Sequence, residues 1–199
     1  HTWSGRLAEG YPSLAALISA HYGPQLPMSY LSFGGYDFTA GIVARTRSGN
    51  VGALERLAYP DRINPDDELS SYHSERAQQL IRDTRQARNG ALMESELLPK
   101  VQHSMNLLFT AQVGADELKK LAEYLPDPLD NSGNPINRQA QVALAAYRAG
   151  ISVATNINLG GFDTHGNHDA GHIPRLQTLL EGVDFIWEEA AIQGVQDNI

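Results

Sequence analysis

The stretch most informative about the fold of this chain is residues 151–193, which read ISVATNINLGGFDTHGNHDAGHIPRLQTLLEGVDFIWEEAAIQ. From Ile151 to Leu159, larger side chains alternate with Ser, Ala and Asn, which is the period of two that a β-strand produces. A Gly-Gly turn and a His-rich loop follow. From Ile173 to Gln193 the apolar residues return at helical spacing on one face. This order predicts a mainly parallel α/β sheet, with 151–159 as an interior strand and the helix packed across its face.

The loop from Gly160 to His172 carries the chemistry of this stretch, because three of the seven His residues of the chain lie within it. Imidazole and carboxylate are ligands that zinc, manganese and iron accept where thiolate is absent. Asp163 and His165 are two positions apart and therefore face the same side of an extended segment. We expect Asp163 and one of His165 or His168 to bind a metal, because chemistry in such sheets gathers on loops after the strands.

An alternative interpretation of the loop is a solvent-exposed polar segment whose His side chains bond to water or backbone. His172 precedes a proline at the expected helix start, so we expect a surface residue of the first turn there and not a ligand. Ser32 lacks the strand, sharp turn and helix that place a hydrolase nucleophile, and Gly34-Gly35 is expected to form a simple turn.

Most of the other segments of the chain are predicted to be helices. In chain order we expect a helix over 12–22, a strand over 28–33, a loop with short turns over 37–62, a helix over 66–88, a helix over 91–112 that Pro99 disturbs, a helix over 115–124, a surface loop over 127–135 and a helix from Asn137 to Gly150. No flexible linker flanks residues 66–124, so they are expected to be a helical insertion or cover within one domain over 1–199.

Composition narrows the class of protein. The 199 residues are 42% hydrophobic and 19% charged, which suits one globular domain. A formal net charge of −8 argues against nucleic acid as a partner, and no apolar run reaches the length of a membrane span. With no Cys, a disulfide scaffold, a thiolate metal site and a cysteine nucleophile are excluded. The chain opens on His-Thr-Trp and stops straight after a helix, so we expect a piece of a longer protein.

The strand, the Gly-Gly-Phe-Asp-Thr-His motif at 160–165 and the following helix together resemble the signature of DUF1501 proteins. These are bacterial proteins of the alkaline phosphatase and sulfatase-like superfamily, often exported with a twin-arginine signal. The resemblance covers about residues 137–199. At the start of the chain, Thr2-Trp-Ser-Gly-Arg6 is similar to the Trp-x-(Thr/Ser)-Gly element that follows the nucleophile in the family. The motif is specific for the family and not for one activity.

The resemblance implies an alkaline-phosphatase-like three-layer α/β sandwich with a mainly parallel sheet and a site for two metals at the strand ends. Asp163 and a nearby His would bind one metal. The superfamily commonly places that His four residues after the Asp, where this chain has Asn167, so the match moves to His165 or His168.

The resemblance also implies that part of the site lies outside this chain. It places the nucleophile and the first metal-binding Asp before His1, so the catalytic residues are expected there and none is assigned within residues 1–199. An Asp/Glu-Phe-Gly-Arg-Thr element and an Asp-His pair are expected after Ile199. The chain would thus carry the middle of a site.

From these observations and the resemblance we expect a metal-dependent hydrolase of small phosphate or sulfate esters. The resemblance implies that it is exported and is periplasmic or extracellular. The metal would polarise the ester oxygen and lower the pKa of a hydroxyl nucleophile. Zinc is the expected ion, with manganese or calcium as alternatives. The second hypothesis is a non-catalytic secreted protein that keeps the DUF1501 fold for binding or assembly.

Overall fold

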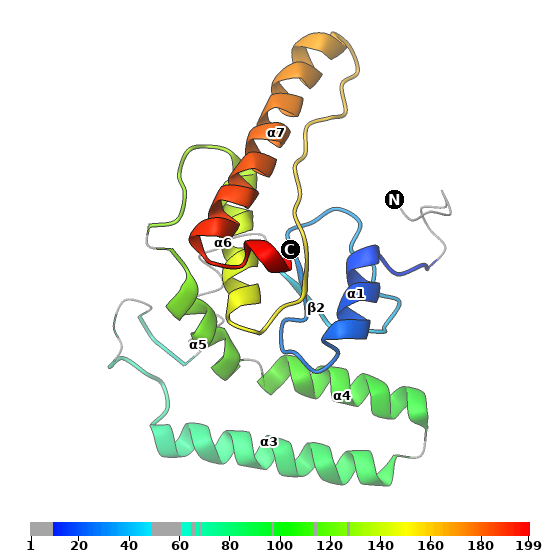
Figure 1. The fold of residues 1–199 in the computed structure, drawn as a ribbon. Coiled ribbons are helices and arrows are strands. Elements are labelled where there is room, and N and C mark those ends of the chain that lie inside the picture. The colour runs from blue at the N-terminus through cyan, green and yellow to red at the C-terminus, as the bar shows by residue number, and fades with distance from the viewer. Residues whose placement is uncertain are drawn as a thin grey trace.

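The computed structural model describes residues 10–48, 61–64, 67, 69–96, 98–113, 115–126 and 128–199, the side chains of 108–119 excepted. It is a mixed α/β structure with a small parallel sheet (Figure 1). The strands are β1 (Tyr30–Ser32), β2 (Arg45–Arg47) and β3 (Ala154–Asn156), in the order β2-β1-β3. The helices are α1 (Leu14–Tyr22), α3 (Glu75–Ser95), α4 (Pro99–Val113), α5 (Ala115–Tyr124), α6 (Pro135–Arg148), α7 (His168–Ile192) and the 3-10 helix η1 (Gln196–Asn198).

The central strand β1 has helices on both of its faces. Leu31 is fully buried and packs in a cluster with residues of α5 and α6, among them Leu121 and Val142. Its neighbour Tyr30 points to the opposite face, where it packs with Ala16 of α1 and with Val43. The alternation of a strand thus divides the core between two layers of helix, which confirms the parallel α/β class.

Several elements lie where the sequence predicts them. The helix expected over 12–22 is α1, whose first turn is capped by Ser13 Oγ accepting from the Ala16 N–H at 3.2 Å. The strand expected over 28–33 is β1, and the helix over 115–124 is α5. At Pro99 the chain interrupts its helix fully, since α3 ends at Ser95 and the proline takes the first position of α4.

Other boundaries differ. The expected loop over 37–62 contains the parallel strand β2 in its described part, and residues 49–60 lie outside the described residues. Of the helix expected over 66–88, α3 begins only at Glu75, after the cap Ser74, and continues to Ser95. Helix α6 starts before its expected cap, because Asn134 Oδ1 accepts from the Ile136 N–H at 3.0 Å and Pro135 suits the first turn.

The strand expected over 151–159 is shorter and less central than predicted. Only Ala154–Asn156 is strand, and among the described strands it pairs with β1 alone, at the edge of the sheet. Part of the flanking backbone has other partners. The N–H groups of Ile151 and Ser152 bond to the Ala146 carbonyl at the end of α6, and the side-chain amide of Gln139 exchanges two hydrogen bonds with the backbone of Asn158.

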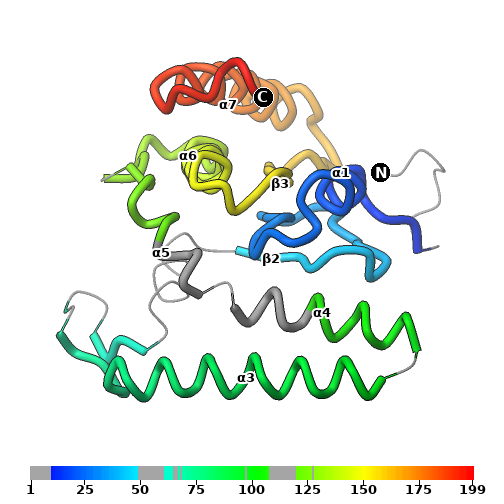
Figure 2. Tube along the Cα trace, turned by 60° about the horizontal axis from the view of Figure 1, so that its bottom comes forward, coloured from blue at the N-terminus to red at the C-terminus, as the bar shows by residue number. Residues whose placement is uncertain are grey.

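Helix α7 corrects the prediction for 173–193 in two ways. It starts at His168, so Pro174 lies inside the helix and not at its start. Its partner is α6, on which it is stacked away from the strands (Figure 2). The expected core face is therefore largely solvent-exposed, with Leu176 at 49%, Leu180 at 65% and Trp187 at 55% exposure.

Helices α3 and α4 lie side by side as an antiparallel pair along one side of the molecule (Figures 1 and 2). In α4, His103 Nε2 donates to the Gly41 carbonyl at 3.1 Å, and α5 contributes Leu121 to the core. The helices within residues 66–124 thus contact the sheet-bearing part, while the single domain over 1–199 stays a prediction. In the described part of the chain, no helix has both the length and the apolar character needed to cross a membrane.

Candidate functional site

The candidate metal-binding loop leaves β3 and runs to the far end of α7, where the helix begins (Figure 1). Along the loop, exposure alternates as in an extended segment. Phe162 and Thr164 are half-buried, whereas Asp163 and His165 are 86% and 91% exposed at their side chains. The extended backbone therefore presents one pair of side chains to α7 and the other pair to solvent.

Asp163 and His165 come together on the solvent side, as their two-residue spacing predicts. The Oδ2 atom of Asp163 lies 3.6 Å from Nε2 of His165. This distance is longer than a hydrogen bond. The two groups thus converge without forming a direct hydrogen bond.

The spacing and the chemistry of this pair fit a bound zinc ion. Two ligands at about 2.1 Å from a tetrahedral zinc stand about 3.4 Å apart, close to the 3.6 Å between the Asp163 and His165 atoms. A mixed nitrogen and oxygen pair suits zinc or manganese better than calcium, which prefers oxygen ligands. Within the described ranges, no group of three or more His, Cys, Asp or Glu side chains converges. A metal ion at this loop would therefore take two ligands from the pair and would need further ones from elsewhere.

His168 and His172 face the loop itself. His168 Nδ1 lies 2.6 Å from Thr164 Oγ1, and His172 Nε2 lies 2.7 Å from the Phe162 carbonyl oxygen and 3.1 Å from Thr164 Oγ1. The structure thus pairs His165 with Asp163, and it engages Nδ1 of His168 with Thr164. His172 is not a first-turn surface residue as expected, because α7 begins at His168 and places it half-buried in the second turn.

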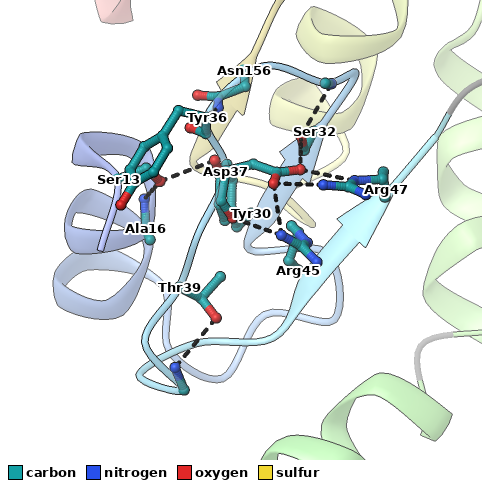
Figure 3. A network of polar contacts seen from close by, with 12 residues as sticks. Ser13, Ala16, Tyr30, Ser32, Tyr36, Asp37, Thr39, Arg45, Arg47 and Asn156 are labelled. Atoms are coloured by element: carbon teal, nitrogen blue, oxygen red, sulfur yellow. Dashed lines mark hydrogen bonds and ion pairs between the residues drawn. The ribbon is translucent and has the colours of Figure 1, made fainter. Parts of the chain in front are cut away.

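A second polar cluster lies at the carboxyl ends of β1 and β2, around Asp37 (Figure 3). The Asp37 carboxylate is buried and accepts hydrogen bonds from Ser32 Oγ at 2.7 Å, from Arg45 Nη1 at 2.7 Å and from Arg47 Nη2 and Nε at 2.7 and 2.9 Å. On β3, Asn156 Nδ2 donates to the Tyr36 carbonyl at 2.9 Å. These bonds fasten the loop after β1 to the ends of all three strands.

The electrostatics keep Asp37 ionised. Burial alone would raise the pKa of this carboxyl, but the hydrogen bonds from Arg47 and Ser32 and the charges of Arg45 and Arg47 outweigh it and lower the pKa below its usual value. Ser32 donates its hydroxyl proton to Asp37 and accepts from the Gly34 N–H at 3.2 Å. Both bonds tie the end of β1 to the loop that follows it.

Sequence reasoning missed the Asp37 cluster. The signal that could have found it is Arg-Thr-Arg at 45–47, since two arginines two positions apart share one face of a strand. Asp37 itself gave no comparable signal, because it lies in a glycine-rich stretch expected to be a loop.

The start of the chain carries two further expectations, and both fall outside the described residues. Residues 2–6, which resemble the element after the family's nucleophile, are among them. So is His1, before which the resemblance places the nucleophile and the first metal-binding Asp. The nucleophile before His1 therefore stays a prediction.

Comparison of the chain with models of protein families, with curated proteins and with solved structures gave no match in any of the three.

Proposed function

We propose that this chain is part of an exported, metal-dependent hydrolase of small phosphate or sulfate esters, periplasmic or extracellular. The observation that carries the proposal is the convergence of Asp163 and His165, 3.6 Å apart and open to solvent, on the loop after a parallel strand. The resemblance of this loop to the DUF1501 motif supports the substrate class. The parallel sheet with helices on both faces of β1 is compatible with an alkaline-phosphatase-like three-layer sandwich as the fold of the whole protein.

The residues of the loop divide the work. Asp163 offers a carboxylate that neutralises charge on a divalent ion, and His165 offers Nε2 as a neutral ligand. Their high exposure leaves room beside them for a substrate and for further ligands. A zinc ion held there would polarise the ester oxygen and stabilise the negative charge of the leaving group. The hydroxyl nucleophile is expected before His1, and the remaining ligands are expected outside residues 1–199.

The alternative is a non-catalytic secreted protein that keeps the same fold for binding. It is favoured by the number of donors, because the described residues bring only two together at this loop. Two ligands can position an ion only weakly, whereas catalytic zinc sites use three protein ligands. The two functions thus differ in whether other parts of the protein complete the site.

The experiment that separates them uses the full-length protein purified without chelators. Elemental analysis gives its zinc and manganese content, and release of 4-nitrophenol from its phosphate and sulfate esters gives turnover. We expect stoichiometric metal and turnover that EDTA abolishes and zinc restores. Metal without turnover of either ester supports the binding protein, and absence of stoichiometric metal contradicts the proposed site.

A further inference from the structure

Thr164 stands between the two candidate ligands and points the opposite way. Its side chain lies on the half-buried side of the loop, against α7, while those of Asp163 and His165 face solvent. Its hydroxyl lies within hydrogen-bond distance of two imidazoles one helical turn apart, His168 and His172. The two rings meet edge to face with centroids 5.4 Å apart.

The partners of these groups define the direction of the hydrogen bonds. A carbonyl oxygen can only accept, so His172 Nε2 carries a proton and donates it to Phe162 at 2.7 Å. Thr164 Oγ1, 3.1 Å from the same nitrogen, shares this single N–H as a second acceptor, and its own hydroxyl proton is then available to His168 Nδ1 at 2.6 Å. The backbone of Phe162 and the side chain of Thr164 are thereby both held by the second turn of α7.

Two glycines allow the loop to lie this close to the helix. A Cβ atom on Gly171 would stand 2.6 Å from Cγ2 of Thr164, so any side chain there would push the threonine away. On the loop, Gly161 has φ +90°, and a Cβ there would stand 2.6 Å from Nε of Arg175. The contact between loop and helix therefore depends on the absence of a side chain at Gly171 and on the left-handed backbone conformation at Gly161.

We propose that Thr164, held by His168 and His172, is a positioning residue that fixes the loop so that Asp163 and His165 are presented together to one metal ion. This inference rests on the proposed function. Thr164 itself contributes no ligand, because its hydroxyl is turned toward the helix. By holding the backbone between the two ligands, it reduces the conformational entropy that binding an ion would otherwise remove.

The test compares zinc affinities by calorimetry on the full-length protein and its variants. Thr164→Val keeps the shape and removes the hydroxyl, and we expect zinc to bind about tenfold more weakly, the lower end of the effect of groups that support metal ligands. Thr164→Ser restores the hydroxyl and should bind within about threefold of the wild type, since a purely steric role could not be rescued in this way. Gly171→Ala should weaken binding like Thr164→Val, because the methyl group displaces Thr164.

Thermal unfolding of each variant shows whether a loss of zinc binding comes from a loss of folding. We expect little change in the thermal midpoint, because this loop and the first turns of α7 hold no buried residue. Wild-type affinity in Thr164→Val, with zinc binding lost in Asp163→Asn, would overturn the positioning role and leave the proposed function standing. Equal loss of affinity in the Val and Ser variants would also overturn it. Failure of the wild-type protein to bind zinc would overturn the proposed function and this inference together.

Discussion

Gly182 of α7 lies directly against Ile136 of α6. A Cβ atom at position 182 would stand 2.7 Å from three side-chain carbons of Ile136, which is itself buried at the first turn of α6. This approach fixes where the two helices cross, and it explains why α7 stacks on α6 although much of its apolar face remains exposed.

Gly182→Ala should therefore destabilise the protein. Overpacking of a well-packed contact costs about 1–3 kcal/mol, and the better helix propensity of alanine returns up to about 1 kcal/mol of it. We expect a net loss of about 1–2 kcal/mol in the free energy of unfolding, measured by urea denaturation. A variant as stable as the wild type would show that α6 and α7 are not in this contact.

Gly90→Ala provides the matched control in α3. This glycine is also inside a helix, but apart from its chain neighbours and the nearby backbone of α3, no atom of the described residues lies within 4 Å of the position of its missing Cβ. Alanine should fit without strain and raise the free energy of unfolding by about 0.5–1 kcal/mol through helix propensity. If Gly182→Ala lowers the free energy of unfolding and Gly90→Ala raises it in the same urea experiment, the loss comes from the contact between α6 and α7.

Asn134 links α6 to α7 through its two side-chain atoms. Its Oδ1 caps α6 at the Ile136 N–H, and its Nδ2 donates to the Thr178 carbonyl of α7 at 2.8 Å. Asn134→Ala removes both bonds and should cost about 1–2 kcal/mol of stability. Asn134→Asp keeps the capping oxygen and loses the donor to α7, so its thermal midpoint should fall between those of Ala and wild type. An Asp variant no more stable than Ala would assign the whole effect to the link with α7.

Asp37→Asn tests the polar cluster around Asp37 at the carboxyl ends of β1 and β2. Breaking a fully buried ion pair costs about 3–5 kcal/mol. The guanidinium side chains of Arg45 and Arg47 are 33% and 59% exposed. Water therefore solvates the two guanidinium groups in part when the carboxylate is lost. We expect Asp37→Asn to lower the free energy of unfolding by about 1–2 kcal/mol at pH 7.

The loss of stability in Asp37→Asn depends on pH in a direction that follows from the pKa of Asp37. The pKa of Asp37 in the folded protein is below the ordinary value of 3.8, so its contribution is present above that pH and disappears as the pH falls through the lowered pKa. The stability gap between wild type and Asp37→Asn should thus be constant near neutrality and shrink below about pH 4. The exposed Asp184 on α7, changed to Asn, is the control. A gap that does not change in acid would contradict the ion-pair account.

Local signals predicted the elements they govern. The helices expected over 12–22 and 115–124 and the strand expected over 28–33 rest on residues within each segment, and α1, α5 and β1 lie there. The extent of β3 could not be read in this way. Residues 151–159 alternate like a strand, but on both sides of Ala154–Asn156 part of the backbone bonds instead to the end of α6 and to the side chain of Gln139.

The same distinction holds for the site. The spacing of Asp163 and His165 places them on one side of an extended loop, and that much followed from the sequence. The contact of Thr164 with α7 did not follow from the sequence. It requires the helix to begin at His168, whereas the expected start was at Pro174. Likewise, the meeting of Asp37 with Arg45 and Arg47 depends on the parallel pairing of β1 and β2, which only the tertiary structure reveals.

Calorimetric titration of the full-length protein with zinc, set beside Asp163→Asn, decides whether this loop binds a metal ion. Asp169→Asn is the matched control, an exposed carboxylate in the first turn of α7. We expect stoichiometric binding by the wild type and by Asp169→Asn. Asp163→Asn should bind zinc at least about tenfold more weakly with unchanged thermal stability, because an exposed loop residue adds little to the fold. Full zinc binding by Asp163→Asn, or no binding by the wild type, would contradict a metal site at this loop.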